Sequence, residues 1–406
     1  MTDISVPPAP TQRSGPLSGI RIIDMTSVLM GPYATQILAD YGADVIKIES
    51  NEGDLIRLAG AMRTPKMGSL FLHANRNKRS VVLDAKSPAG REAMLTMCRS
   101  ADVFVSNIRP PALERLGLGY PDVATVNPAI IYASLVGYGQ DGPYAQRPAY
   151  DDLIQGISAL PSLIASRSGE PQYTPLTLAD KVSGLAGVNA ILAALVHKVR
   201  TGVGQSIEVP MFEVMSQFVL GDHLGGLSFD PPHGPVGYNR LLSPDRRPYR
   251  TADGYICALV YTDRHWRNFF QIMEQPETFA AEPLFHDHAV RTRNYDEVYR
   301  RFSEMMATKT TIAWQALFEE YDIPWSPAHS VEDLLKDPHL EAVDFFQMSE
   351  HPTEGTLRLM RQPVRFSATP ASIYRHPPTL GEHTREVLAE FGLDQAACVG
   401  TGAGND

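Results

Sequence analysis

Short apolar runs alternate with segments of helical length through the first third of the chain. The apolar runs predict strands at 19–25, 43–50, 79–85, 102–107 and 129–139. The segments between them predict helices, several of which have proline in the first turn or end at glycine. Strands that alternate with helices in this way predict an α/β fold with a parallel, doubly wound sheet.

Ligands of such sheets gather at the carboxyl ends of the strands, so the loops there are the first place to look for a site. The loops to consider are "TSVLMGP", "SNEGD", "SNIRPP" and "GYGQDGP". No GxGxxG pattern follows the first strand, so a dinucleotide fold is only weakly indicated. The loop "GYGQDGP" offers flexible backbone and exposed amides, a pattern that also fits an ordinary surface turn.

A lone carboxylate, Asp180, precedes a long apolar segment that predicts a helix at 181–200. The simplest interpretation is a helix cap that accepts a hydrogen bond from a first-turn amide. The alternative is a nucleophile, because amide donors and the helix dipole would favour the ionised carboxylate and lower its pKa. The next turn is built from small residues, which suits close approach of a substrate or tight packing: Ser183, Gly184, Ala186 and Gly187. Asp151 and Asp152 begin another predicted helix, where we expect them to act as caps.

The pattern changes near residue 230, where "FDPPHGPVGYNRLLSPDRRPYR" predicts a linker rich in proline and arginine. The stretch "RPYRTADGYICALVYT" then predicts a hairpin around an Asp-Gly turn. Amphipathic helices follow, and together these elements predict a second, smaller α+β domain of roughly a hundred residues.

The composition of the chain argues against several classes of protein. The formal net charge of −10 argues against a general nucleic-acid binder, which needs a basic face. Three distant cysteines with no CxxC spacing predict neither a disulfide framework nor a thiolate metal site, and fit a reducing cytoplasm. The most apolar run, "GLAGVNAILAALV", is shorter than the roughly 20 residues that cross a bilayer, so no membrane span is expected.

Seven cations lie near predicted strand ends or in the following loops. They either bind a polyanion such as a nucleotide phosphate or form a solvated charged rim, and the sequence does not separate these alternatives. The seven are Lys47, Arg57, Arg76, Lys78, Arg79, Arg109 and Arg115.

Several long segments, taken in order, resemble the class III CoA-transferase family, which includes crotonobetainyl-CoA transferase, formyl-CoA transferase and 2-methylacyl-CoA racemase. They are "PLSGIRIIDMTSVLMGPYATQILADYGADVIKIES", "NRNKRSVVLDAKSPAGREAML", "ADVFVSNIRPPALERLGLGY", "NPAIIYASLVGYGQDGPYAQRPAYDDLIQG", "LADKVSGLAGVNAILAALVHKVRTGVGQSIEVPMFE" and "TLGEHTREVL". The match is nearly continuous from residue 16 to residue 218 and thins afterwards.

The resemblance implies a Rossmann-like large domain from both ends of the chain, a small domain from the middle, and an interlocked homodimer. On this basis we expect a disordered leader at 1–15, a large CoA-binding domain at 16–228 and 346–406, and a small domain with linkers at 229–345. The implied partners are an acyl-CoA and a small carboxylic acid, with no nucleic acid and no membrane. No metal or tightly bound cofactor is expected, because the coenzyme A thioester is the substrate.

The resemblance also assigns residues. Asp180 aligns with the family's nucleophile, which would pass CoA on through an aspartyl anhydride and an aspartyl-CoA thioester. The expected CoA-site residues are Val28, Lys47, Arg79, Leu83, Asn107, Ile108, Arg115, Tyr138 and Met211. Amides of the glycine loop are expected to stabilise oxyanions, with Gly137, Gly139 and Gln140 as the residues concerned.

Departures from the family pattern bear on the reaction. Family racemases have histidine where this chain has Tyr150, a poor proton shuttle near pH 7, so transfer is favoured over racemisation. Ser27, Leu29 and Val136 replace residues typical of formyl-CoA transferase, which argues against formate–oxalate exchange. The arginines of "NRLLSPDRRPYR" suggest a dicarboxylate such as succinate. The alternatives are a 2-methylacyl-CoA racemase or epimerase of the same fold and a non-catalytic nucleotide-binding protein.

Overall fold

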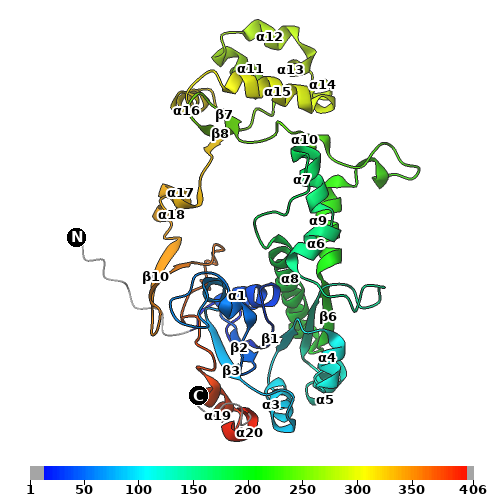
Figure 1. The fold of residues 1–406 in the computed structure, drawn as a ribbon, viewed down its shortest axis with the longest axis vertical. Helices are drawn as coiled ribbons and strands as arrows, with labels where there is room; N and C mark the ends of the chain where they lie inside the picture. Colours follow the sequence, from blue (N-terminus) through cyan, green and yellow to red (C-terminus); the bar gives the residue numbers. More distant parts are fainter. Residues whose placement is uncertain (1–12, 400–406) are drawn as a thin grey trace, which may run out of the picture. The chain divides into compact units, whose positions relative to one another are not determined.

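The computed structural model describes residues 13–399, which divide into two compact units (Figure 1). Unit 1 contains the chain up to Ser158, Thr174–Gln217 and the chain from His339 onward. Unit 2 contains Ala159–Tyr173 and Phe218–Pro338. The second unit thus begins before the predicted boundary at 229 and takes in a helix from the first half of the chain. Of the leader predicted at 1–15, residues 1–12 lie outside the described residues, whereas Arg13 forms an ion pair with Asp44.

Unit 1 is built on a parallel sheet of six strands in the order β3-β2-β1-β4-β5-β6. The strands are β1 (Arg21–Met25), β2 (Asp44–Glu49), β3 (Lys78–Val82), β4 (Val103–Ser106), β5 (Ile131–Val136) and β6 (Gln205–Pro210). This is the order of a doubly wound dinucleotide-binding sheet, with its switch point between β1 and β4. The α/β sheet expected from the apolar runs is therefore confirmed.

Helices cover both faces of this sheet (Figure 1). The helices and short turns of unit 1 are α1 (Met30–Asp40), η1 (Leu55–Leu58), α2 (Ser69–Ala74), α3 (Pro88–Cys98), α4 (Pro110–Arg115), α5 (Tyr120–Val126), α6 (Asp151–Ile157), α8 (Leu178–Thr201), α19 (Thr384–Glu390) and α20 (Gln395–Val399). A β-hairpin of β10 (Phe346–His351) and β11 (Gly355–Met360) also belongs to this unit. Two helices run from one unit into the other, namely α9 (Met211–His223) and α18 (Pro338–Ala342).

The two ends of the chain share one hydrophobic core. Val387 and Leu388 of α19 and Cys398 of α20 are buried in the same cluster as Phe104 of β4. Phe104 in turn stacks on Tyr132 of β5, with 5.0 Å between the ring centroids. Because burial of these apolar side chains stabilises the sheet, unit 1 needs residues from both ends of the chain.

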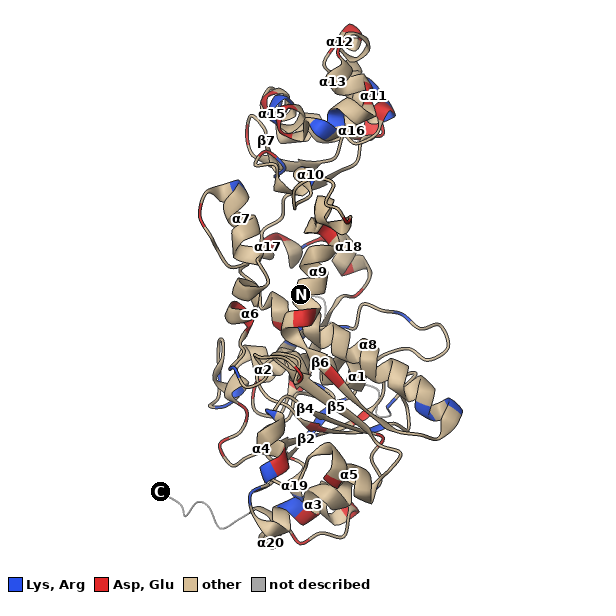
Figure 2. Ribbon diagram, turned by 90° about the vertical axis from the view of Figure 1, so that its right-hand side faces the viewer, with Lys and Arg blue, Asp and Glu red and all other residues tan. Residues whose placement is uncertain are grey.

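The helix α8 is longer than the sequence predicted. It has 24 residues, and by length and composition alone it could cross a membrane, contrary to the expectation from its apolar run. In unit 1 it packs against α1, α6, β5 and β6 instead. A Cβ on Gly184 would stand 2.8 Å from the Met30 carbonyl oxygen of α1, so this small residue serves tight helix packing. Asp180 lies in the first turn of α8, and Lys198 and Arg200 lie in its last, which complements the helix dipole (Figure 2).

Unit 2 is an α+β unit with an aromatic core. Its three-stranded antiparallel sheet consists of β7 (Tyr249–Arg250), β8 (Tyr255–Ala258) and β9 (Trp325–Pro327), and the first two form the predicted hairpin. Its helices are α7 (Leu160–Ser168), η2 (Gly225–Ser228), α10 (Asn239–Leu242), α11 (Asp263–Ile272), α12 (Pro276–Ala281), α13 (Pro283–His286), α14 (His288–Arg293), α15 (Tyr295–Met306), α16 (Thr311–Glu320) and α17 (Val331–Leu334). The side chains of Trp266, Phe269, Phe302 and Trp314 fill the core.

Candidate active site

Asp180 occupies the first turn of α8 rather than the position before it. The helix begins at Leu178 after Thr177, so Asp180 is the third helical residue, and the predicted cap role is wrong. Its own backbone N–H donates a hydrogen bond to Oδ1 of Asp151 over 3.0 Å. A carboxylate from another helix therefore satisfies an amide of the first turn of α8, where backbone amides have no partner within the helix.

Asp151 is itself held in place from two sides. It lies in the first turn of α6, where Tyr150 rather than Asp151 is the residue before the helix. Its Oδ2 accepts a hydrogen bond of 2.6 Å from the side-chain amide of Gln155, one turn later. The side-chain oxygen Oε1 of Gln155 accepts hydrogen bonds from the backbone N–H and the hydroxyl of Thr174. The bond between Asp151 and α8 is not evident from the sequence, because it joins residues 29 positions apart.

Asp180 is 9% exposed as a residue, and none of the hydrogen bonds found among residues 13–399 reaches its carboxylate. Burial, and then the nearby charge of Asp151, raise its pKa to about 7, while Lys181 acts in the opposite direction. The expected lowering of its pKa is therefore wrong, because desolvation outweighs the favourable helix terminus. The result is a carboxyl group that changes its charge near neutral pH.

A cavity of about 480 Å³ opens at the carboxyl edge of the sheet, beside the switch point between β1 and β4. Loops after β1, β2, β3 and β4 form its wall, and its lining includes Leu83 and Ile108 from the predicted CoA-site residues. Exposed Lys86 also lines it and was not singled out from the sequence. Lys86 directly follows the predicted strand at 79–85, at the strand end where ligands of such sheets bind, and this position was the signal that could have identified it.

Three more predicted CoA-site residues lie next to this cavity in the chain. The side chain of Asn107 bridges the backbone of Ser27, with bonds of 2.9 Å to its nitrogen and 2.7 Å to its oxygen. Val28 has a φ of 65°, and its N–H donates to Asp54 over 2.9 Å. Arg115 ends α4 as an exposed residue directly before Leu116, which lines the cavity.

Lys47 and Arg79, in contrast, face protein carboxylates. The ammonium of Lys47 has no exposed side-chain area and forms an ion pair of 2.9 Å with Asp54. Arg79 is buried against Asp44 at 2.8 Å and also pairs with Glu390. Direct contact with a CoA phosphate does not fit this burial, which corrects the expectation for both residues.

The same correction applies to most of the predicted cationic rim. Arg57, Arg76 and Lys78 are also buried and paired with carboxylates. Five of the seven cations therefore form neither a solvated rim nor a free anion site; they stabilise buried negative charges inside unit 1. Only Arg109 and Arg115 of the seven are clearly accessible or at the surface.

The glycine loop after β5 has its amides occupied. The N–H of Gly139 donates to Glu213 over 2.8 Å, and the N–H of Gln140 donates to Glu208 over 3.0 Å. The expected oxyanion role of these two amides is not compatible with this arrangement. The carbonyl of Gly137 accepts a bond from Phe212, which ties the loop to α9.

Two buried side chains support the same loop. Tyr138 is 6% exposed and packs against Phe212, and Met211, at the start of α9, is 5% exposed. Both predicted CoA-site residues therefore lie beneath the surface of the loop region in this structure.

Known proteins resemble the chain over nearly its whole length. The model of the family described as CoA-transferase family III matches residues 17–384. This chain belongs to CoA-transferase family III. The transferase is 33% identical to a succinate–glutarate CoA-transferase of Agrobacterium fabrum, over 93% of this chain and 96% of that protein. It is 31% identical to the human succinyl-CoA:glutarate CoA-transferase, over 92% of this chain and 86% of that protein.

A solved structure shows the same fold. The crystal structure of Rv3272 from Mycobacterium tuberculosis superposes on the transferase with a TM-score of 0.78 at 30% identity, covering 92% of this chain and 99% of that one. The non-catalytic nucleotide-binding alternative is thereby set aside, since the chain is an enzyme of the CoA-transferase class.

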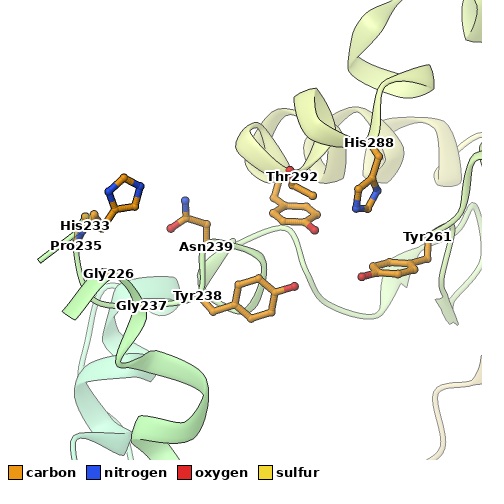
Figure 3. Close-up of a pocket in the computed structure, with 11 residues that line it drawn as sticks. Gly226, His233, Pro235, Gly237, Tyr238, Asn239, Tyr261, His288 and Thr292 are labelled. Carbon is orange, nitrogen blue, oxygen red and sulfur yellow. The ribbon is translucent and has the colours of Figure 1, made fainter. Parts of the chain in front are cut away.

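The transferase has further cavities within unit 2. One of about 340 Å³ is lined by tyrosine and histidine rings, glycines and a few polar side chains, and Figure 3 shows Tyr238, Tyr261 and His288 around its opening. Another, of about 470 Å³, is lined by four arginines. Neither cavity was predicted, although the arginine-rich stretch before β7 had been singled out.

Proposed function

We propose that the enzyme moves CoA from an acyl-CoA donor to a carboxylic acid through covalent intermediates on Asp180. The observation that carries this proposal is the state of Asp180: a nearly buried carboxylate with no hydrogen-bond donor among the described residues, on a helix turn fixed by Asp151. A largely buried carboxylate without a protein donor is less well solvated than one in water, and once ionised it is therefore a stronger nucleophile.

The reaction proceeds in four balanced steps. The ionised Asp180 oxygen attacks the donor thioester carbonyl, which forms a mixed anhydride and releases CoA thiolate. The thiolate attacks the aspartyl carbonyl, which gives an aspartyl-CoA thioester and releases the donor acid. The acceptor carboxylate then attacks that thioester to form a second anhydride and free thiolate. Attack of the thiolate on the acceptor carbonyl yields the new acyl-CoA and regenerates Asp180.

The nucleotide portion of CoA is assigned to the cavity at the carboxyl edge of the sheet. Support comes from its position at the switch point, where ligands of this sheet type bind. Lys86 and Arg115 are the cations placed to meet its phosphates. Lys47 acts indirectly, because it fixes Asp54, which in turn holds the N–H of Val28.

The proposed acid substrates are dicarboxylates such as succinate. The names of the two relatives above support this class, since one names CoA transfer between succinate and glutarate and the other names succinyl-CoA and glutarate. Racemisation is not favoured, because Tyr150 stands where the resemblance places a racemase histidine and its side chain is 64% exposed.

We also propose that the enzyme works as an interlocked homodimer. Support comes from apolar side chains on α8 that no neighbour covers in the single chain, with Val196 59% and Val199 81% exposed. Such exposure is typical of a surface that meets another protein. Light scattering after size-exclusion chromatography tests this, and a monomeric mass at micromolar concentration would contradict it.

A donor and acceptor screen tests the proposed reaction. Purified protein is incubated with pairs of acyl-CoA and acid, and new acyl-CoA is measured by mass spectrometry. We expect Asp180→Asn to fold normally and to lose transfer by at least 1,000-fold, a barrier increase of about 4 kcal/mol. The matched control is Asp152→Asn, which changes an exposed carboxylate beside Asp151 and should retain transfer. Substantial turnover by the Asp180 variant would refute the covalent route.

A further inference from the structure

The cavity of about 470 Å³ in unit 2 collects positive charge from separate segments of the chain. We call it the arginine cavity, and its polar lining consists of Arg167, Arg240, Arg246, Arg247, Tyr249, Tyr299 and the thiol of Cys257. Its volume lies in the range of small-molecule sites.

The backbone and side chains around the cavity hold these arginines in place. Arg167 of α7 donates to the carbonyl oxygen of Arg246. The N–H of Arg246 closes a turn onto the carbonyl of Ser243 over 3.2 Å. Residues from α7 and from the segment after α10 therefore meet at this wall through defined hydrogen bonds, with the side chains of Arg167 and Arg247 exposed.

Arg240 is fixed by aromatic partners. Its Nε donates to the hydroxyl of Tyr299 over 3.0 Å, and its guanidinium lies 5.3 Å from the ring centroid of Tyr261. Both contacts orient the cation without neutralising its charge. Burial raises the pKa of Tyr299, so this hydroxyl stays protonated at neutral pH and can donate to an anion.

The positive charge of the cavity is largely uncompensated. Arg247 forms an ion pair with Asp245 at 2.9 Å. Across residues 13–399, no carboxylate forms an ion pair with Arg167, Arg240 or Arg246. Three guanidinium groups thus share one cavity without a counterion from the described protein.

Several other cations of this chain form ion pairs with carboxylates. Arg300 and Arg301, at the surface of the same unit, each pair with glutamates. The buried cations of unit 1, such as Lys47 and Arg57, each pair with a carboxylate. Three guanidinium groups that line one cavity without a carboxylate partner form a local positive charge that a bound anion would compensate.

We propose that the arginine cavity binds a carboxylate of a dicarboxylic acid substrate and gives the enzyme its preference for dicarboxylic over monocarboxylic acids. This assignment rests on the proposed CoA transfer between acids. The planar guanidinium groups match a carboxylate with paired hydrogen bonds, and the Tyr299 hydroxyl adds a donor. A site built to bind a charged group rejects an analogue that lacks it, because its own groups are left unpaired.

Cys257 provides a direct reporter that needs no turnover. It lines the arginine cavity, whereas Cys98 and Cys398 are buried in unit 1. The inactive Asp180→Asn variant is treated with iodoacetamide, and alkylation of Cys257 is followed by peptide mass spectrometry with glutarate, pentanoate or no acid. We expect glutarate to slow alkylation at least threefold, pentanoate to have no effect, and the protection to disappear in a further Arg246→Gln substitution. Equal protection by both acids, or none by glutarate, would overturn the assignment.

Steady-state kinetics distinguish a carboxylate from a CoA phosphate as the bound anion. In Arg246→Gln we expect KM for glutarate to rise at least tenfold, with KM for the acyl-CoA donor within twofold of the wild type. Arg250→Gln is the matched control, because Arg250 is exposed on β7 and does not line the cavity. A rise in donor KM that disappears with dephospho-CoA esters would instead assign the cavity to a phosphate and overturn the proposal. If the wild type transfers CoA to no acid while glutarate still protects Cys257, the proposed transfer reaction is refuted, whereas the proposed carboxylate site in the arginine cavity is supported.

Discussion

The carboxylate of Asp151 accepts a hydrogen bond of 3.0 Å from the backbone N–H of Asp180, although the two residues lie in the first turns of different helices. The contact orients the first turn of α8 and also places a second negative charge near the Asp180 carboxyl group. It therefore sets the position and the proton affinity of the proposed nucleophile together.

Replacing Asp151 by asparagine separates these two effects. The Asn oxygen still accepts the bond from Asp180, whereas the charge that raises the pKa of Asp180 is removed and the bond from Gln155 to Oδ2 is lost. We expect the acidic limb of the pH profile of kcat/KM to move to lower pH by roughly one unit or less, with Asp152→Asn leaving it unchanged. An unchanged profile in Asp151→Asn would show that this charge does not act on the nucleophile.

The raised pKa of Asp180 also predicts a pH-dependent stability change. Its pKa in the folded enzyme is about 7, above the unfolded value of 3.8, so folding favours the protonated form and stability is lost as pH rises from about 4 to about 7. Asp180→Asn removes this cost and should raise the free energy of unfolding at pH 8 by about 2–4 kcal/mol, with a smaller gain at pH 5. Thermal melting at the two pH values measures it, and a variant less stable at pH 8 than the wild type contradicts the assigned burial.

Two lysines near the sheet edge should respond in opposite ways. Lys47→Ala leaves Asp54 buried without its partner and should cost about 3–5 kcal/mol of folding stability. Lys86→Ala removes an exposed cation from the cavity wall and should raise KM for the acyl-CoA at least threefold with little change in melting temperature. A stable Lys47→Ala protein that has lost only CoA affinity would restore Lys47 as a direct phosphate ligand.

Glycines on two helices test the packing of α8. Gly184→Ala places a methyl group 2.8 Å from the Met30 carbonyl oxygen and should destabilise unit 1 by about 1–3 kcal/mol. Gly221→Ala on α9 meets nothing within 4 Å and should stabilise by about 0.5–1 kcal/mol. Melting temperatures of the two variants should therefore shift in opposite directions; a neutral Gly184 variant would point to open space for a ligand at that turn.

The sequence was sufficient for strands β1 to β5 of the parallel sheet, because these are short apolar runs that alternate with helices along the chain. Strand alternation also identified the edge where the cavity opens. It could not identify the partner of Asp180, since the bond to Asp151 spans 29 positions and depends on how α6 meets α8. Likewise, the sequence does not distinguish Lys47 from Lys86. Only the structure shows that Lys47 is buried in an ion pair with Asp54, whereas Lys86 is exposed.

Mass spectrometry of the enzyme during turnover tests the central claim most directly. The protein is quenched in acid after brief incubation with succinyl-CoA and no added acceptor, and the modified peptide is sequenced. We expect CoA in thioester linkage on Asp180, its loss on addition of glutarate, and conversion of Asp180 to a hydroxamate by hydroxylamine. No adduct on Asp180 under conditions of rapid transfer, or an adduct on another residue that turns over at the catalytic rate, would contradict the account.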